Sequence, residues 1–295
     1  MVDARIRYRT SREDSARWQG FRFRPDDIVI STPAKAGTTW MHMICALVVF
    51  QTADLPAPLS TLSPWLDLRL RPVWEVHDQL ENQRHRRFIK THTPLDGLPI
   101  DPRVTYVVVG RDPRDMAVLL HYQRANVKLN IFRRHETKHV PATPDVRETM
   151  LTWMNCDDTP QNNLVTLRGV VWHLADAWSR RRSPNVVLFH YSDLSRDLGA
   201  EMRRLAARLG ITIPEQTWPA LVESATFERM RQRSDDLAPD VPLGIINDSG
   251  EFFRSGSSGQ WRDWLTDEDV TRYEERIAAL APAGFVDWLH YGSHT

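Results

Sequence analysis

Cysteine and an excess of charge of one sign are both scarce in this sequence. Its 295 residues include two cysteines, Cys45 and Cys156. Two cysteines are too few for a disulfide scaffold, and their spacing matches no zinc pattern. The low cysteine content favours a reducing, cytoplasmic environment. Lysine plus arginine and aspartate plus glutamate number 38 each, a formal net charge of +0 at pH 7. No overall field favours nucleic acid, so we expect no nucleic-acid partner, and any anion site needs local cations.

Long apolar runs are also missing. The longest, residues 44–50, is far too short for a bilayer, which needs about 20 apolar residues. Near the N-terminus, arginines alternate with acidic residues and no apolar run follows them, unlike a secretory signal. We therefore expect a soluble protein without a membrane span.

The chain does contain short β-branched runs that alternate with helical patterns. This alternation predicts an α/β fold, with a central parallel sheet flanked by helices. Neither an internal repeat nor a long low-complexity linker interrupts it, so we predict a single domain over residues 1–295. The predicted strands are 28–30, 87–90, 104–109 and 185–190; the predicted helices are 38–50, 113–129, 163–182 and 195–209, and residues 234–260 are predicted to be a long loop.

Residues 32–40, with the sequence TPAKAGTTW, follow the first strand and open a helix. Backbone amides and the helix dipole can hold an anion in that context. Lys35 adds a point charge, and Gly37 permits close approach of the backbone. The nucleotide-binding pattern G-x-x-x-x-G-K-[ST] is absent, which counts against an ordinary ATPase. An ordinary glycine-containing turn remains the alternative reading of this loop alone.

This loop resembles that of the cytosolic sulfotransferases, which reads approximately Y-P-K-S-G-T-T-W. The match runs from Lys35 to Trp40, with Ala36 in place of serine. The resemblance implies that the loop holds the 5′-phosphosulfate end of 3′-phosphoadenosine 5′-phosphosulfate (PAPS). The residues implied in donor binding here are Lys35, Ala36, Gly37, Thr38 and Thr39, with Trp40 against the adenine.

Two further segments resemble motifs of the same family. RDPRDMAV, from Arg111, is similar to R-N-P-K-D-V-A-V, whose arginine grips the 3′-phosphate. RSGSSGQW, from Arg254, is similar to R-K-G-x-x-G-D-W, which implies that Arg254, Ser255 and Gly256 close on that phosphate. Two family contacts are altered, because Leu119 replaces a serine and Ser255 replaces a lysine.

Two aromatic residues complete the resemblance, which extends over about residues 26–280. Tyr191 and Phe227 match family residues beside the adenine. The resemblance therefore implies a P-loop-kinase-like nucleotide-binding topology, PAPS as donor and 3′-phosphoadenosine 5′-phosphate (PAP) as product.

The catalytic prediction rests on Lys90-Thr91-His92, which resembles the family's K-T-H-x-P. An acceptor hydroxyl must lose its proton as it attacks sulfur, and a neutral imidazole suits this task. We predict His92 as general base, Lys35 at the leaving phosphate and Lys90 beside the transferring group. A sulfuryl group carries less charge than a phosphoryl group, so we expect no metal.

One motif points elsewhere. His135-Glu136-Thr137-Lys138-His139 is a literal H-E-x-x-H, the zinc motif of metallopeptidases. Pro141 follows almost at once and apolar flanks are scarce, so the stable helix that the motif needs is not expected. A solvated loop or part of the acceptor entrance is the preferred reading.

The acceptor is left open as a phenol, a sterol-like alcohol or a glycolipid, small or lipid-linked. Residues 52–85, 129–162 and 234–253 are expected to shape its pocket, and Trp65 is one of their apolar side chains. Alternative functions are a nucleotide-dependent small-molecule kinase and a PAP- or PAPS-binding protein with little turnover. The sequence also leaves the oligomeric state open.

Overall fold

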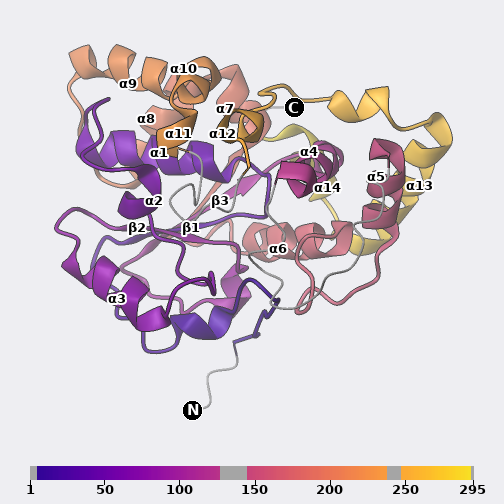
Figure 1. Ribbon diagram of the computed structural model, residues 1–295, viewed down its shortest axis with the longest axis horizontal. Coiled ribbons are helices and arrows are strands. Elements are labelled where there is room, and N and C mark those ends of the chain that lie inside the picture. Colours follow the sequence, from indigo (N-terminus) through magenta and orange to yellow (C-terminus); the bar gives the residue numbers. More distant parts are fainter. Residues whose placement is uncertain (1–4, 127–144, 238–246, 294–295) are drawn as a thin grey trace.

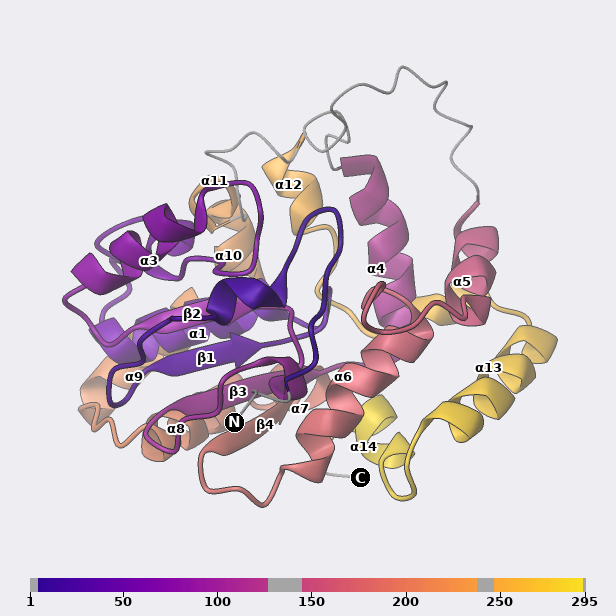
Figure 2. The ribbon, with the colours of Figure 1, turned by 90° about the horizontal axis from the view of Figure 1, so that it is seen from below.

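A four-stranded parallel sheet forms the centre of the protein. The computed structural model describes residues 5–126, 145–237 and 247–293. The strands lie in the order β2-β1-β3-β4, of which Figure 1 labels the first three and Figure 2 all four, and every pair is parallel. This arrangement confirms the predicted α/β class. The strands are β1 (Ile28–Ser31), β2 (Phe88–Thr91), β3 (Thr105–Gly110) and β4 (Val186–His190).

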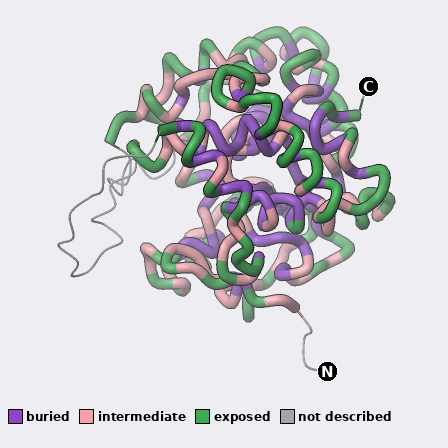
Figure 3. The backbone as a smooth tube through the Cα atoms, turned by 90° about the vertical axis from the view of Figure 1, so that its right-hand side faces the viewer, coloured by how far each residue is buried: buried purple, intermediate pink, exposed green. Residues whose placement is uncertain are grey.

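The strands are mostly apolar because the sheet is covered on both faces. Ile30 and Val107 belong to one buried cluster, whereas Val29 and Val108 belong to the other. Side chains alternate across a strand, so successive residues serve opposite cores. Figure 3 shows this buried interior beneath an exposed outer layer.

One face of the sheet is covered by α1, which follows the first strand, and by the helices that come directly after β4, from α7 to α11 (Figure 1). Met41 and Leu47 of α1 are fully buried in this cluster. The helices that supply this cluster are α1 (Thr38–Phe50), α2 (Leu59–Leu62), α7 (Tyr191–Arg196), α8 (Leu198–Arg208), α9 (Trp218–Ser224), α10 (Phe227–Gln232) and α11 (Ser234–Leu237).

The opposite face packs against a group formed by α4, α5, α6 and α13, which stand beside the sheet in Figure 2. Several short helices in the connecting segments complete this layer and the border of the sheet. The remaining elements are η1 (Ser15–Trp18), α3 (Val73–Asn82), η2 (Leu95–Gly97), α4 (Pro113–Asn126), α5 (Val146–Asn155), α6 (Leu167–Ser179), η4 (Glu215–Thr217), α12 (Ser249–Phe252), η6 (Gln260–Asp263), α13 (Asp267–Leu280) and α14 (Val286–Tyr291).

Capping side chains explain where the helices depart from prediction. The helix predicted over 163–182 is shorter, because Thr166 accepts a hydrogen bond from the Gly169 amide and starts α6. The helix predicted over 195–209 is confirmed for most of its length as α8, but its first residues belong to α7. Asp197, with φ −145°, ends α7 and caps α8 by accepting from the Ala200 amide.

Other boundaries agree with prediction or fall partly outside the described residues. The predicted 38–50 helix is confirmed as α1, and Asp112 caps α4 by accepting from the Arg114 amide. The predicted end of that helix at residue 129 lies outside the described residues. Within 234–260, the described parts include α11 and α12, so the prediction of an unstructured loop was wrong there.

The parallel sheet gathers the predicted motifs at one edge. The carboxyl ends of parallel strands share an edge, where open α/β sheets bind ligands. Ser31 pairs with Thr91, and Gly110 pairs with His190. The same edge of the sheet therefore carries the phosphate loop, the K-T-H segment, Arg111 and Tyr191. Across the described ranges, none of the helices combines the length and apolar character that a bilayer crossing requires.

Candidate active site

A cavity of about 450 Å³ opens at this edge of the sheet. Each strand sends residues into its wall, and a loop near the C-terminus closes it. Thirteen of the fourteen predicted site residues line it: Lys35, Gly37, Thr38, Thr39, Trp40, Lys90, His92, Arg111, Tyr191, Phe227, Arg254, Ser255 and Gly256. Leu119, which replaces a family serine, lines it as well.

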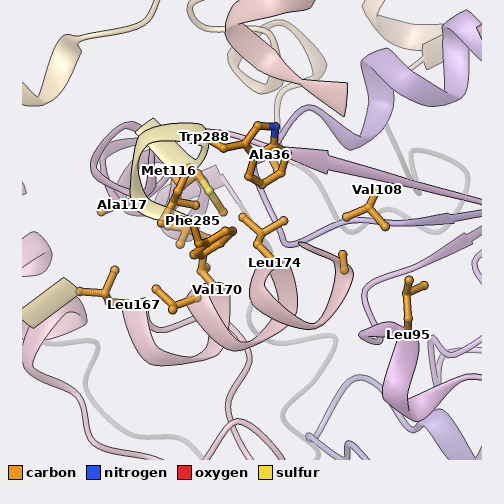
Figure 4. Close-up of a cluster of buried hydrophobic side chains, with 14 of the residues drawn as sticks. Ala36, Leu95, Val108, Met116, Ala117, Leu167, Val170, Leu174, Phe285 and Trp288 are labelled. Atoms are coloured by element: carbon orange, nitrogen blue, oxygen red, sulfur yellow. The ribbon is translucent and has the colours of Figure 1, made fainter. Parts of the chain in front are cut away.

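Ala36 is the predicted site residue that does not line the cavity. Its side chain is fully buried in the core cluster that includes Val108 and Trp288 (Figure 4). Its amide donates to the Pro33 carbonyl at 3.3 Å. The methyl group of Ala36 therefore anchors the loop from behind.

The phosphate loop is held in an unusual backbone conformation. Lys35 has φ 69° and Gly37 has φ 103°, both in the left-handed region. A side chain rarely adopts that conformation unless its surroundings impose it, and such strain is common at ligand sites. The Thr32 and Thr38 hydroxyls lie 2.6 Å apart and join the two ends of the loop. A Cβ at position 37 would also lie 3.3 Å from the Tyr191 ring, so glycine fits best.

Lys35 places a cation inside the cavity. Its Nζ lies 4.4 Å from the centre of the Phe252 ring. Burial, with added repulsion from Lys90 and Arg111, lowers the pKa of Lys35 to about 7. A bound anion would relieve this repulsion and restore the charge.

Arg111 and Arg254 are arranged alike. Their guanidinium carbons stack at 3.7 Å on Tyr191 and 3.6 Å on Tyr122 respectively. Arg111 Nη2 donates to the Ser257 carbonyl at 3.0 Å, and Arg254 Nη2 donates to Gln260 Oε1 at 2.7 Å.

In both arginines the Nε–H is buried and lacks a partner within the described chain. Buried donors are almost always satisfied in native proteins. The two Nε–H groups therefore fit an anion such as a phosphate, which a guanidinium binds through parallel hydrogen bonds.

Aromatic rings surround the Gly256 backbone. Trp40 donates its Nε1–H to the Ala225 carbonyl at 2.8 Å, and its ring meets that of Tyr191 edge-on at 5.2 Å. The Tyr191 hydroxyl donates to the Gly256 carbonyl at 2.8 Å. A Cβ at position 256 would lie 2.7 Å from the Phe227 ring. These rings offer flat faces on which a base could stack.

The tautomer of His92 follows from its contact with Thr32. His92 Nδ1 lies 2.6 Å from the Thr32 carbonyl oxygen, which can only accept, so Nδ1 carries the proton. Nε2 is then the basic nitrogen. Burial, together with the charge of Lys90, lowers the pKa of His92 to about 3. The imidazole is therefore neutral near pH 7, the form that a general base requires.

Trp65 and Asp67 support the K-T-H segment. The sequence did not predict this role for either residue. The Trp65 ring lies 3.8 Å from Lys90 Nζ and contacts the His92 ring edge-on at 4.7 Å. Asp67 is fully buried, and its Oδ2 accepts from the hydroxyls of Thr91, at 2.5 Å, and Thr93, at 2.6 Å. The hydroxyls on either side of His92 thus share one carboxylate oxygen.

Other cavity residues were not singled out as site residues from the sequence. Ala34, Leu194 and Thr226 lie in or beside the predicted motifs. Leu68, Phe252 and Phe253 fall in segments that were predicted to shape the acceptor pocket, and the rest come from segments without a motif. The full set is Arg12, Ala34, Leu68, Gln123, Leu194, Ser195, Leu198, Thr226, Met230, Phe252 and Phe253.

The H-E-x-x-H segment, residues 135–139, lies outside the described residues. Elsewhere, over the three described ranges, no three His, Cys, Asp or Glu side chains are grouped as metal ligands.

A parallel sheet with a cation-lined cavity at its carboxyl edge defines an open α/β fold that binds anionic ligands at that edge. Residues 25–283 match the family model described as the sulfotransferase domain. The chain therefore belongs to the sulfotransferase family.

Comparison with individual proteins agrees with this assignment. A glycolipid sulfotransferase of Mycobacterium tuberculosis is 41% identical over 309 residues, covering 98% of this chain and 95% of that protein. Sulfotransferase 1A1 of Rattus norvegicus is 26% identical and covers 88% and 86%. A crystal structure of retinol dehydratase with retinol and PAP superposes with a TM-score of 0.70 at 22% identity, covering 90% and 84%. The sheet and its flanking helices accordingly have the P-loop-kinase-like fold.

Proposed function

We propose that the protein transfers the sulfuryl group of PAPS to a hydroxyl group of a glycolipid. One observation carries this proposal: a base-form imidazole, His92, shares its cavity with two arginines whose buried Nε–H groups have no partner among the described residues. The cavity thus combines an anion site with a proton acceptor. The similarity to a glycolipid sulfotransferase supports the choice of acceptor.

The cavity residues suit the donor in three groups. Lys35, Thr38 and Thr39 would hold the phosphosulfate, and Arg111 and Arg254 the 3′-phosphate. The rings of Trp40, Tyr191 and Phe227 would enclose the adenine. Ser255 and Gly256 would contribute from the closing loop, and the Ala36 methyl would keep the phosphate loop in place.

The reaction requires one proton transfer and one exchange of bonds at sulfur. His92 Nε2 accepts the proton of the acceptor hydroxyl while its oxygen forms the new O–S bond. The S–O bond to the 5′-phosphate breaks, and its electron pair stays on PAP. Lys35 neutralises the charge that appears there, and Lys90 stabilises the sulfuryl oxygens. The products are a sulfate ester, PAP and a proton held by His92.

Apolar side chains line the cavity beside these polar groups. They include Trp65, Leu68, Met230, Phe252 and Phe253. Such a wall supports an acceptor with a hydrophobic portion, because burial of apolar surface contributes roughly 25 cal/mol per Å².

Calorimetric titration with PAP tests the donor site. We expect PAP to bind the wild type far more tightly than ATP does. Lys35→Ala and Arg111→Ala should each weaken PAP binding by about ten- to hundredfold, because each removes a charge-assisted contact. Arg103→Ala, an exposed arginine paired with Asp101, is the matched control and should change nothing. ATP binding without PAP binding would favour the kinase alternative instead.

A further inference from the structure

A basic pocket of about 430 Å³ lies on the surface, separate from the active-site cavity. Its lining contains three arginines and one carboxylate. The residues that form it are Asp14, Arg17, Arg69, Leu70, Arg71 and Pro72. None of them belongs to the described lining of the active-site cavity, so the proposed reaction gives these three cations no role.

The carboxylates beside the basic pocket are already paired. Asp14 accepts two hydrogen bonds from Arg7, at 3.0 Å and 2.7 Å. Glu75 lies 3.4 Å from Arg71 Nε. The remaining arginines of the lining, Arg17 and Arg69, therefore give the pocket an excess of positive charge.

Arg17 lies close to the other two arginines of the pocket. Burial, together with the charges of Arg69 and Arg71, lowers the pKa of Arg17. The carboxyl groups of Asp67 and Asp14 oppose this shift. An anion bound among the three arginines would relieve their repulsion and favour the charged form of each.

Arg17 and Arg69 use only part of their hydrogen-bonding capacity. Arg17 Nε donates to the Leu66 carbonyl at 2.7 Å, but its Nη2 is buried without a partner among the described residues. Arg69 Nη1 donates to the Thr10 carbonyl at 2.9 Å. A phosphate group suits such a set, because its oxygens accept several hydrogen bonds from guanidinium groups.

An exposed tryptophan follows directly after the basic pocket. Pro72 lines the pocket and is the N-cap of α3, and Trp74 is the second residue of that helix. Trp74 is 63% exposed, the highest value for a large hydrophobic residue in the described ranges. Figure 1 shows α3 at the border of the molecule. Tryptophan is enriched where a membrane meets water, because its ring is apolar and its N–H is polar.

We propose that the basic pocket binds the phosphate group of an anionic phospholipid, with Trp74 in the headgroup region, so that the protein docks on a membrane surface. Complementary charge supports this partner. The choice of a lipid over a soluble phosphate rests on the proposed function, because a glycolipid acceptor would itself lie in a membrane. Leu68 lines the active-site cavity and the next residue, Arg69, lines the basic pocket, so docking would hold the cavity close to its acceptor.

Co-sedimentation with two kinds of vesicle tests the proposal: phosphatidylcholine alone, and equal parts of phosphatidylcholine and phosphatidylglycerol. We expect the wild type to bind the phosphatidylglycerol vesicles about tenfold or more tightly, and the double variant Arg69→Gln with Arg71→Gln to lose most of this preference. Trp74→Ser should weaken binding to the same vesicles. Added salt should also weaken it, because it screens exposed charges.

The double variant Arg203→Gln with Arg272→Gln is the matched control. It removes the same charge from two exposed arginines that each pair with a glutamate, on α8 and α13. Figures 1 and 2 both place α13 on the far side of the molecule from α3. The control should keep the full preference. PAP affinity should be unchanged in both double variants, which checks that they are folded.

Equal wild-type binding to both kinds of vesicle, or an equal loss of preference in both double variants, would overturn the docking surface. Inorganic phosphate, titrated with the donor site filled by PAP, distinguishes the other source of this chemistry. If it binds through Arg69 and Arg71 while the vesicles show no preference, the partner is a soluble phosphate. The vesicles contain no glycolipid and the assay needs no turnover. A protein that shows the vesicle preference but binds no PAP therefore contradicts only the proposed function.

Discussion

Lys35 couples donor binding to protonation. In the ligand-free protein its pKa is lowered to about 7, chiefly by burial. A bound polyanion favours the charged amine and therefore raises this pKa. Above pH 7, PAP binding should be accompanied by proton uptake, and PAP affinity should fall as the pH rises from 7 to 9.

Calorimetry in two buffers with different ionisation enthalpies measures this uptake. We expect the apparent binding enthalpy at pH 8 to depend on the buffer in the wild type. In Lys35→Met this dependence should largely disappear. A wild-type enthalpy that is independent of the buffer would contradict the assignment of this proton to Lys35.

His92 should affect turnover far more than donor binding. It is the base-form imidazole in the cavity, and its Nδ1 is already engaged by Thr32. His92→Ala should lower kcat by about 10²- to 10⁴-fold, the usual contribution of a general base. PAP affinity should change little. Parallel measurement of kcat and PAP binding checks this, and equal losses in both would assign His92 to binding instead.

At the scale of elements, residues 64–68 act as a support for β2. The Lys90 amide donates to the Pro64 carbonyl at 3.0 Å, and the Leu66 amide donates to the Lys90 carbonyl at 3.2 Å. This ladder places Asp67 where it accepts from Thr91 and Thr93. The position of His92 therefore depends on a segment about 25 residues earlier in the chain.

Removal of this carboxylate should impair both folding and catalysis. Asp67→Ala leaves two buried hydroxyls without their acceptor, which costs about 1–3 kcal/mol of unfolding free energy. We expect kcat to fall while PAP affinity is retained, because the donor residues lie elsewhere. Asp67→Asn keeps an acceptor oxygen and should restore much of kcat. Denaturant unfolding and steady-state kinetics test the pair, and a purely structural role would leave kcat per folded molecule unchanged.

At the scale of the whole molecule, a buried ion pair joins the starts of β1 and β2. Arg87 and Asp27 are both 1% exposed and form two hydrogen bonds. Loss of Asp27 leaves the buried Arg87 charge with the exposed Glu81, 3.6 Å away, as its remaining counter-ion. Asp27→Ala should therefore lower the free energy of unfolding by about 3–5 kcal/mol, a large part of the total for a typical domain.

Urea unfolding measures this loss. Asp101→Ala breaks an ion pair whose arginine, Arg103, is exposed. This control should cost less than about 1 kcal/mol, because water screens such pairs. Similar losses of unfolding free energy in both variants would show that the buried pair stabilises the fold no more than the exposed pair does.

Much of the donor site was accessible from the sequence because its residues follow strands in short motifs. Lys35, His92 and Arg111 each stand within a few residues of the end of a predicted strand, and parallel pairing of those strands brings them to one edge. The break between α7 and α8 at Asp197 was not predicted, and the reason is local. An aspartate can end one helix and cap the next, and periodicity alone does not distinguish the two cases.

The sequence by itself determined the α/β class, the phosphate loop and the family motifs, since these depend on local periodicity and on short, ordered patterns. Only the tertiary structure decided that Arg12 lines the cavity and that Trp65 and Asp67 support the K-T-H segment. They lie in segments without a motif, and their role arises from long-range packing against β2. The pKa values of Lys35 and His92 were likewise set by the fold, because burial and neighbouring charges exist only once the chain is packed.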